Sequence, residues 1–386
     1  MIELQGKYNS AIVYADSIDE TTNAQILRML NHPALDGGKV RIMPDCHAGS
    51  GCCIGFTQEI VDKICVNFVG VDIGCGVTTI GFEGISHPSQ DDLEELDRTI
   101  RKYIPSGFAS HKTPVVEELP NYFGNRIKTV AERIGYEKDP MLQIGTLGGG
   151  NHFIEAGFSD KPVNGKNFWI TVHSGSRNFG LSIANYYQKR AVQHVQEKYP
   201  EFASMKDLAF LERGTQDFED YLYAMDVAQE YAHFNRMVIL AQTTKRFHKV
   251  NSPAPMIIES VHNYIDLDSS ILRKGAISAK QDDPVLIPFN MRDGMIIGKG
   301  KGNPDWNVSA PHGAGRLLAR GKAKQELSMD QFKSDMDGIY TTCVSQSTLD
   351  ESPAAYKNTD VIVAAIHPTV EIVSWIKPVY NFKASE

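Results

Sequence analysis

The spacing of apolar residues along the chain predicts several helices and short strands. Apolar side chains recur every three or four positions, which predicts helices at 21–31, 91–104, 123–135, 181–197 and, as one or two helices, 206–247. Between them, runs rich in β-branched and aromatic residues predict strands at 38–43, 66–71, 77–82, 167–172, 255–261, 283–289 and 294–300. The elements mix without strict β-α alternation. This favours an α+β fold with mixed, largely antiparallel sheets and peripheral helices.

The bulk composition predicts one large globular unit. The 386 residues are 42% hydrophobic and 22% charged, and no Pro/Ser-rich linker or repeat divides them, so we expect residues 1–386 to form a single domain. The longest apolar runs, such as 361–366, are far too short to cross a bilayer, and the first ten residues lack an apolar signal region. The six cysteines include no C-x-x-C pair and do not resemble a disulfide scaffold. We therefore expect a reduced, cytoplasmic protein without a membrane partner.

The formal net charge of −8 limits how a nucleic acid would be held. A protein that coats nucleic acid by electrostatics alone would be basic, so a polyanion must meet a local basic patch, or else the substrate is small. The best candidate patch lies in SAPHGAGRLLARGKAK (309–324), which supplies Arg316, Arg320, Lys322 and Lys324. Together with Arg177 these residues would form a basic arc, although the last three could equally be a solvated helix face. Arg316 and Arg320 would share a face if a helix started here.

Side chains of metal-binding type stand beside Gly, Asn or Ser in four segments. They are Asp72 and Cys75 in VGVDIGCGV (69–77), His152 in GTLGGGNHFIE (145–155), His173 in VHSGSRNFG (172–180) and His262 in ESVHNYI (259–265). Each alone is more often a core residue. Oxygen, sulfur and nitrogen ligands together suit a borderline ion such as Mn, Fe, Co, Ni or Zn. Five ligands exceed the needs of one tetrahedral ion, so a shared Cys or Asp bridging two ions would use them all.

His312, in the Gly-rich segment HGAGR, is the candidate nucleophile. A histidine at a Gly-rich turn backed by arginine can attack phosphorus and be stabilised as a phosphoramidate. The alternative is a basic helix N-terminus that only binds an anion. Ser176 and Arg177 follow His173 and would suit a phosphate beside a metal, and Glu155 would accept hydrogen bonds from a base or a sugar. A lysine-based nucleotidyltransferase is disfavoured because no K-x-D-G motif occurs, and a P-loop is absent as well.

Eight segments occur in the order found in RtcB-type RNA-splicing ligases, which the chain resembles over nearly its whole length. They are MPDCHAGSG (43–51), VGVDIGCGV, GTLGGGNHFIE, VHSGSR, VHN, RKGAISA (273–279), HGAGR and AYKNTD (355–360). The resemblance implies an RtcB-like fold and a GTP- and manganese-dependent ligase. Such an enzyme joins RNA 3′-phosphate or 2′,3′-cyclic phosphate ends to 5′-hydroxyl ends, in RNA repair or tRNA splicing, through a guanylylated histidine that matches His312.

The resemblance also implies roles for further residues. The five ligands would hold two Mn(II) ions, with Cys75 as the bridge. The residues implied to hold guanine or phosphate of GTP are Asn151, Glu155, Asn263, Gly313, Gly315, Arg316, Tyr356 and Lys383. RNA and its phosphates would meet Arg177, Arg316, Arg320 and Lys324, and Asp45 matches an acidic position near the metals. The partners implied are RNA with broken ends, from tRNA or rRNA, and a release-factor-like partner or an archease-type activator.

The chain also departs from the commoner family pattern. Most relatives carry P-G-S-M-G where this chain has PFNMRDG (288–294), and the serine expected shortly afterwards falls at Met295. We therefore expect one nucleotide-binding hydroxyl to be missing, as in a short, divergent subgroup. Two other function classes stay open: a metal-dependent RNA-end phosphatase or cyclic phosphodiesterase, and a non-catalytic RNA-binding partner of a release-factor homologue. Labelling with GTP and manganese separates them from a ligase.

Overall fold

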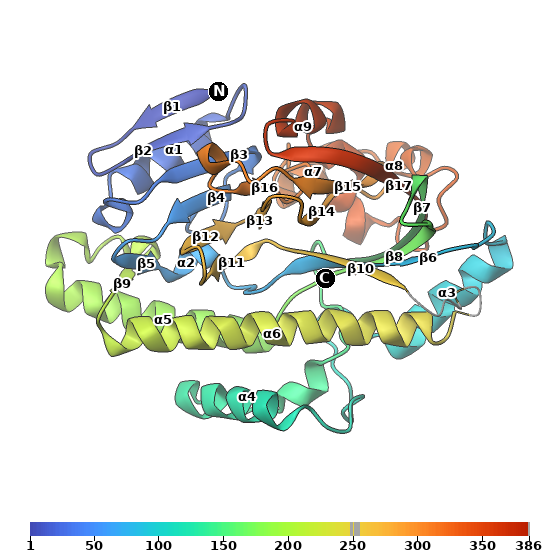
Figure 1. The fold of residues 1–386 in the computed structure, drawn as a ribbon, viewed down its shortest axis with the longest axis horizontal. Helices are drawn as coiled ribbons and strands as arrows, with labels where there is room; N and C mark the ends of the chain where they lie inside the picture. Colours follow the sequence, from blue (N-terminus) through green and yellow to red (C-terminus); the bar gives the residue numbers. More distant parts are fainter. Residues whose placement is uncertain (248–249, 251–254, 385–386) are drawn as a thin grey trace.

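Two large sheets occupy the middle of the computed structural model, which describes residues 1–247, 250 and 255–384 (Figure 1). The strands are β1 (Ile2–Gln5), β2 (Ser10–Val13), β3 (Val40–His47), β4 (Ile54–Glu59), β5 (Lys63–Cys65), β6 (Gly76–Phe82), β7 (Phe153–Val163), β8 (Lys166–Ser174), β9 (Phe210–Glu212), β10 (Met256–Val261), β11 (Asn263–Asp266), β12 (Ile271–Lys274), β13 (Ala276–Ser278), β14 (Pro284–Asn290), β15 (Gly294–Gly300), β16 (Ser309–Pro311) and β17 (Val370–Lys383). One sheet has the order β1-β2-β3-β4-β12-β11 and the other β10-β6-β8-β7-β17-β15-β14.

The direction of the strands confirms the predicted fold class. Two small sheets, β13-β16 and β5-β9, complete the arrangement. Among the named strand pairs of the described chain, only β2 and β3 run parallel. Antiparallel neighbours bring the start of one strand beside the end of the next. Loops that are distant in the sequence therefore meet where adjacent strands of the seven-stranded sheet begin and end.

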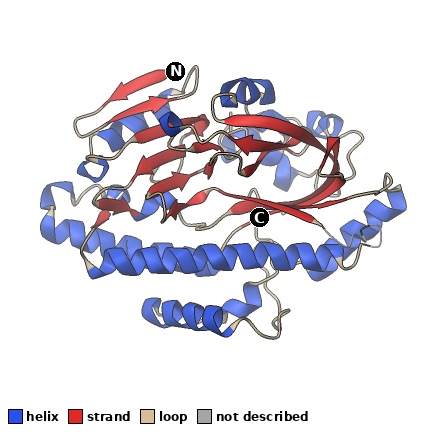
Figure 2. Cartoon of the chain, viewed as in Figure 1, coloured by secondary structure: helices blue, strands red, loops and turns tan. Residues whose placement is uncertain are grey.

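Helices flank the sheets on both sides (Figure 2). They are α1 (Glu20–Leu30), α2 (Val66–Val69), α3 (Gln90–Tyr103), α4 (Asn121–Ile134), α5 (Arg177–Lys198), α6 (Gln216–Thr244), α7 (Arg320–Glu326), α8 (Met329–Asp335) and α9 (Thr359–Ile366). The two longest, α5 and α6, lie side by side along the sheets, and α6 packs against β6 and β8 (Figure 1). The fold is thus α+β with helices at its periphery. No helix among the described residues has the length and apolar character to span a bilayer.

The long helix α6 forms because its sequence supplies both a cap and a buried stripe. The Thr215 hydroxyl accepts a hydrogen bond from the backbone N–H of Phe218, which satisfies one of the free donors of the first turn. Apolar residues such as Tyr231 and Ile239 then recur on the buried face. Two polar residues, Asn235 and Arg236, lie on the same face and are fully buried. This polar pair faces the loops that carry the candidate site.

Two predicted elements differ in the structure. The run at 66–71, predicted as a strand, is instead the one-turn helix α2, which packs against α5 and β12. Its Val and Phe side chains are β-formers, but their burial against neighbouring elements decides the local structure. The segment 206–247 holds the strand β9 before α6 begins. The longest strand, β17, was not predicted because Lys377, Pro378 and Asn381 interrupt its apolar pattern.

The core is divided between the two sheets. The larger cluster includes Phe68, Phe179 and Tyr231 and lies between α5, α6 and the six-stranded sheet. A second cluster, with Phe168 and Leu240, lies between α6 and the seven-stranded sheet. All six cysteines are free and buried. The candidate site occupies the region between the clusters, where strands of the seven-stranded sheet begin and end.

Candidate active site and metal centre

Adjacent strands of the seven-stranded sheet bring the predicted metal ligands together. Cys75 directly precedes β6, His152 precedes β7, His173 is the penultimate residue of β8 and His262 follows β10. The register pairs Val77 with His173, Gly76 with Val261 and Phe153 with His173. Because these strands are antiparallel neighbours, the starts of β6 and β7 lie beside the ends of β8 and β10. The four side chains therefore converge at this end of the strands.

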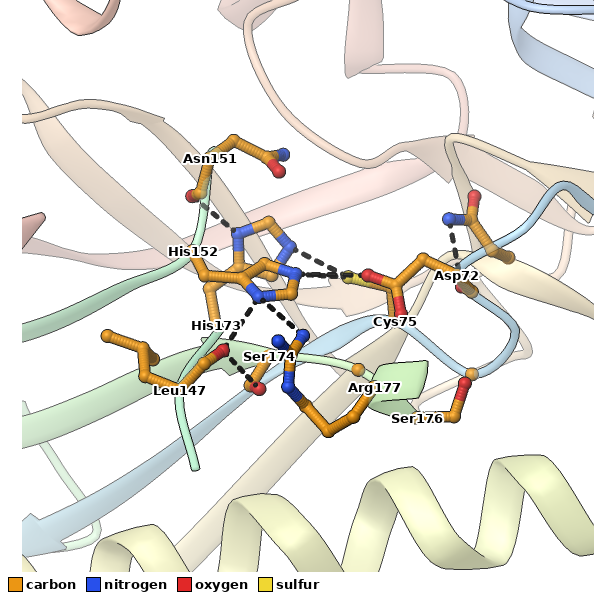
Figure 3. Close-up of polar contacts among 12 residues, drawn as sticks. Asp72, Cys75, Leu147, Asn151, His152, His173, Ser174, Ser176 and Arg177 are labelled. Carbon is orange, nitrogen blue, oxygen red and sulfur yellow. Dashed lines mark hydrogen bonds and ion pairs between the residues drawn. The ribbon is translucent and has the colours of Figure 1, made fainter. Parts of the chain in front are cut away.

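The ligand atoms of these residues are within hydrogen-bonding distance of one another (Figure 3). Cys75 Sγ lies 3.4 Å from His152 Nε2 and 3.3 Å from His173 Nε2. His173 Nε2 lies 3.4 Å from His262 Nε2, and His152 Nε2 lies 3.0 Å from Asp72 Oδ2. The structure therefore brings all five predicted ligands into one connected group, which is called the metal cluster below.

The second nitrogen of two of these rings fixes their tautomers. His152 Nδ1 lies 2.8 Å from the Leu147 carbonyl, and His173 Nδ1 lies 3.1 Å from the Asn151 carbonyl. A carbonyl only accepts, so each Nδ1 carries a proton. Burial lowers the pKa of His173, so its Nε2 turns a lone pair toward Cys75, whereas His152 Nε2 donates to the Asp72 carboxylate. Nitrogen, sulfur and carboxylate atoms that lie 3.0 to 3.4 Å from one another can turn toward one cation. The donor set of imidazole nitrogens, sulfur and carboxylate therefore fits a borderline divalent ion.

Burial and charge set the protonation of the ligands in the protein alone. Burial, with the nearby Asp72 carboxylate, raises the pKa of the Cys75 thiol. Burial also tends to raise the pKa of Asp72, but the hydrogen bond and charge of His152 outweigh it and lower that pKa. A bound cation would act in the opposite sense on the thiol, because a coordinating thiol is deprotonated.

Helix α6 holds the loops that carry the ligands. Arg236 Nη1 donates to the carbonyls of Gly74 and Ser174, at 2.8 and 2.9 Å, next to Cys75 and His173. The Asn235 side chain accepts from the backbone N–H groups of Gly145 and Thr146 and donates to the Thr146 carbonyl. These two buried side chains therefore connect three ligand loops to one rigid helix.

Arg177 lies behind the metal cluster. Its Nη1 is 3.5 Å from His152 Nδ1, and its guanidinium packs on Gly148. A Cβ at Gly148 would come within 2.1 Å of the guanidinium, and the residue has a φ of +84°, so only glycine fits here. Arg177 does not line the main cavity of the described chain. Its role as an RNA-phosphate contact stays a prediction.

A cavity of about 740 Å³ opens beside the metal cluster and brings most of the predicted residues together. Its lining includes Asp72, Cys75, Asn151, Glu155, His173, His262, Asn263, His312, Gly313, Gly315, Arg316, Arg320, Lys322, Tyr356 and Lys383. His152 and Lys324 lie outside this lining, although His152 contacts the cluster from behind. Asn263 also has a structural role, because its side chain accepts from Gly275 N and donates to the Asp72 carbonyl.

His312 is oriented by a buried carboxylate. Its Nδ1 lies 2.7 Å from Asp45 Oδ2, and Asp45 is fully buried. The carboxylate accepts a hydrogen bond from Nδ1–H, so the lone pair of Nε2 is available at the cavity. The ring centroid of His312 lies 4.9 Å from that of His262, beside the metal cluster. Asp45, expected near the metals, thus contacts the candidate nucleophile.

The glycine at position 275 makes room for this histidine. A Cβ there would approach Ile54 to 2.2 Å and His312 Cε1 to 3.3 Å, and the residue has a φ of +61°. Glycine alone combines that backbone conformation with the missing side chain. The RKGAISA segment therefore positions His312.

The buried carboxylate of Glu351 pairs with basic residues of the cavity wall. Glu351 accepts hydrogen bonds from Tyr356 Oη at 2.6 Å and Lys383 Nζ at 2.8 Å, and it lies 2.7 Å from Arg320 Nη1 and 3.2 Å from Arg316 Nη1. Burial tends to raise the pKa of Glu351, but these cations lower it to about 2. Glu351 is therefore ionised and holds the cavity wall together.

Three members of the predicted basic arc are already ion-paired, and one of them is Arg316, which pairs with Glu351. Arg320 Nη1 lies 2.6 Å and Lys324 Nζ 3.4 Å from Asp350. Helix α7 begins at Arg320, so Arg316 precedes it and does not share a helical face with Arg320. Lys322, in contrast, is largely exposed and pairs only at 3.6 Å with Glu326 on its own helix. Among the basic residues of 309–324, Lys322 is thus the one whose charge is least neutralised by an acidic partner.

Met295, where a nucleotide-binding hydroxyl was expected to be missing, does not line the cavity. Met295 is 1% exposed and packs with Leu286, Ile297 and Ile376 in the core. Its sulfur lies 3.6 Å from the Thr171 hydroxyl, and it does not line the cavity. A serine at this position would therefore not reach a nucleotide there. Residues 288–291 line the cavity instead.

The cavity lining also includes residues that were not predicted from the sequence, and three of them are of interest here. His47 lies in the quoted segment MPDCHAGSG, and burial lowers its pKa to about 4, so its ring is neutral at physiological pH. Glu351 lies shortly before AYKNTD, and Asn381 stands two residues before Lys383. The alternation along β17 places Asn381 and Lys383 on one face. A prediction of that strand would have found Asn381.

Cys and His side chains that could hold a metal ion, beside a carboxylate-paired histidine, are typical of a metal-dependent enzyme. The family model described as "tRNA-splicing ligase RtcB" matches residues 25–384. The chain belongs to the RtcB family. It is 31% identical over 375 residues to the RNA-splicing ligase RtcB of Escherichia coli (strain K12), covering 89% of this chain and 90% of that protein. It is 27% identical to the tRNA-splicing ligase RtcB of Aeropyrum pernix, covering 92% and 91%, and 26% identical to that of Thermococcus kodakarensis, covering 92% and 90%.

Proposed function

We propose that this protein is a metal-dependent RNA ligase that joins 3′-phosphate or 2′,3′-cyclic phosphate ends to 5′-hydroxyl ends through guanylylated His312. The observation that carries the proposal is the pairing of His312 Nδ1 with the buried Asp45, which leaves Nε2 free at the cavity beside the metal cluster. The names of the relatives, RNA-splicing and tRNA-splicing ligases, support RNA as the substrate.

His312 begins the reaction as a nucleophile. Its Nε2 attacks the α-phosphorus of GTP, so that an N–P bond forms while the bond to pyrophosphate breaks and pyrophosphate leaves. Asp45 accepts the hydrogen bond from Nδ1–H throughout and offsets the positive charge that develops on the ring. Arg316, in the cavity wall, offsets charge on the phosphate oxygens.

Two further transfers complete the joining. Hydrolysis first opens a cyclic phosphate end to a 3′-phosphate. An oxygen of that phosphate attacks the phosphorus on His312, the N–P bond breaks, and the RNA end carries GMP. The 5′-hydroxyl oxygen then attacks the 3′-phosphorus, GMP leaves, and the hydroxyl proton passes to solvent. The product is a 3′,5′-phosphodiester.

The metal ligands are Asp72, Cys75, His152, His173 and His262. They would hold two Mn(II) ions with Cys75 as the bridge, and bound metal supplies charge neutralisation at phosphate oxygens. The residues that would hold the guanine nucleotide are Asn151, Glu155, Asn263, Gly313, Gly315, Tyr356 and Lys383. All of these nucleotide residues line the cavity beside His312, which supports this assignment.

Covalent labelling tests the nucleophile. Incubation with α-labelled GTP and manganese, followed by denaturing electrophoresis, should leave label on the protein. His312→Ala should abolish the label, while His367→Ala, a histidine outside the cavity lining, should keep it. A His312→Ala protein that still labels would contradict the assignment. An unlabelled wild type that removes phosphate from RNA ends would instead indicate an RNA-end phosphatase.

A cysteine variant tests the bridge. Cys75→Ala should lose most bound metal and all end joining, because its sulfur contacts both His152 and His173. Cys65→Ala is the matched control, since Cys65 is also buried but hydrogen-bonds to the Leu208 carbonyl away from the cavity. Elemental analysis after dialysis gives the metal content. Full metal occupancy in Cys75→Ala would contradict the bridging role.

A further inference from the structure

Two residues of the cavity wall have buried acceptor atoms without partners. Glu155 and Asn381 are cross-strand neighbours in β7 and β17, and both line the cavity. Each is at most 3% exposed. Asn381 Nδ2 donates to Glu155 Oε2 at 2.9 Å, but Glu155 Oε1 and Asn381 Oδ1 have no hydrogen-bond partner. Unpaired buried acceptors cost free energy, so their persistence at a cavity wall indicates a ligand that supplies donors.

The orientation of the Asn381 amide follows from its neighbour. The carboxylate oxygen of Glu155 accepts, so the NH₂ group must face it and the carbonyl oxygen must face away. The nearest cation, Lys383, is occupied by Glu351 at 2.8 Å and by the Asn151 carbonyl at 3.2 Å. The wall therefore presents two adjacent acceptors, one from each strand.

We infer that Asn381 is a specificity-determining residue for the base of the nucleotide, and that it accepts from an exocyclic amino group while Glu155 accepts from the adjacent ring N–H. This inference rests on the proposed function. Guanine offers two adjacent donors, N1–H and the 2-amino group. Hypoxanthine lacks the amino group, and adenine presents an acceptor at N1 beside its amino group. The paired acceptors therefore select guanine over both.

The test compares GMP, IMP and AMP, which do not react with His312. Binding to the manganese-loaded protein is measured by calorimetry. Wild type should bind GMP about tenfold more tightly than IMP, because IMP leaves the Asn381 carbonyl unpaired. Asn381→Leu should bring the GMP affinity close to the IMP affinity and change IMP binding little. Ser374→Ala, on the same strand but bonded to Asp160 outside the cavity, should behave as wild type.

Each other outcome overturns the inference. Two outcomes with the wild-type protein alone would exclude a role of Asn381 in base selection. One is equal binding of GMP and IMP, and the other is tighter binding of AMP than of GMP. An equal loss of GMP and IMP binding in a folded Asn381→Leu protein would reduce Asn381 to a support for Glu155. End joining of RNA by the same wild-type preparation is scored separately. A protein that joins RNA without distinguishing GMP from IMP overturns this inference and leaves the proposed function standing.

Discussion

At the scale of single residues, the carboxylate behind His312 decides the chemistry. Imidazole has two nitrogens, and a nucleophile needs one of them deprotonated and accessible. The buried Asp45 accepts a hydrogen bond from Nδ1–H at 2.7 Å, which selects the tautomer with a free Nε2. The same contact would stabilise the ring once its Nε2 is bonded to phosphorus. Asp45 is therefore a positioning residue for the proposed covalent step.

Replacing Asp45 by asparagine should slow guanylylation strongly. Asn keeps the size of the side chain but removes the negative charge, so we expect the rate of GMP attachment to fall by about a hundredfold or more. Single-turnover labelling with α-labelled GTP measures the rate, and elemental analysis checks that metal is retained. A rate within a factor of two of wild type would show that the charge of Asp45 does not assist His312.

The second feature at the scale of single residues is the protonation of Glu155, in the part of the cavity wall proposed to contact the nucleotide base. Burial raises the pKa of Glu155 to about 8, although the hydrogen bond from Asn381 and the charge of Lys383 oppose it. In the free protein the carboxyl is therefore largely protonated at pH 7. A base that presents N–H donors binds the ionised form, so its binding releases a proton.

GMP affinity should consequently rise with pH between about 6.5 and 8. Below the raised pKa, each unit of pH increases the ionised fraction up to tenfold, and the gain ends as pH passes about 8. Calorimetry of GMP binding in buffers of different ionisation enthalpy gives both the affinity and the proton release. Glu155→Gln cannot titrate, so its affinity should be lower and flat with pH. A wild-type affinity that falls over this range would contradict the raised pKa.

At the scale of elements, helix α6 supports the candidate metal centre. The ligands stand on loops, and loops by themselves hold side chains loosely. Asn235 and Arg236 bind the backbone of three of these loops from one buried face of the helix. A change on this face should therefore act on metal binding without removing a ligand.

Asn235→Leu should weaken metal binding by roughly tenfold to a hundredfold. The leucine fills similar space but leaves the Gly145 and Thr146 N–H groups without their acceptor, so the loop before His152 loses its position. Titration against a competing chelator measures the affinity. Glu219→Leu, on the exposed side of α6, is the control. Unchanged metal affinity in a folded Asn235→Leu protein would show that the loops are held by other contacts.

At the scale of the whole molecule, charge must be arranged locally because the chain is acidic overall, at −8. Asp350 and Glu351 offset part of the charge of Arg316, Arg320, Lys324 and Lys383. Four cations around two carboxylates leave an excess of two positive charges beside the cavity. Lys322 adds an exposed charge on α7. RNA is expected to approach along this side.

Lys322→Glu should weaken RNA binding and reduce its salt dependence. Loss of one phosphate contact lowers the slope of log affinity against log salt by about 1. GMP attachment to His312 should stay unchanged, since the small nucleotide is held by other groups. Filter binding over a range of salt concentrations measures the slope. Lys128→Glu on α4 is the control, because Lys128 is similarly exposed and lies outside the cavity lining. Equal slopes for wild type and Lys322→Glu would exclude this path.

The sequence by itself determined the chemical groups and most of the framework. Periodicity predicted α1, α3, α4, α5 and most of α6, because these helices have one buried and one exposed face. Motifs predicted the five ligands and His312, since Gly, Asn and Ser beside a metal-binding residue are a local signal. These features depend on residues that are neighbours in the chain.

Only the tertiary structure decided which residues act on one another. Asp45 and His312 are 267 positions apart, and Glu155 and Asn381 are 226 apart, so no local pattern connects them. Arg236 lies in the predicted helical region 206–247, where no local pattern indicates its carbonyl partners. Met295 stands where a nucleotide-binding serine was expected, and only the tertiary structure shows that its side chain is in the core. Pairing across antiparallel strands and burial of polar groups are properties of contacts, and contacts are fixed by the fold.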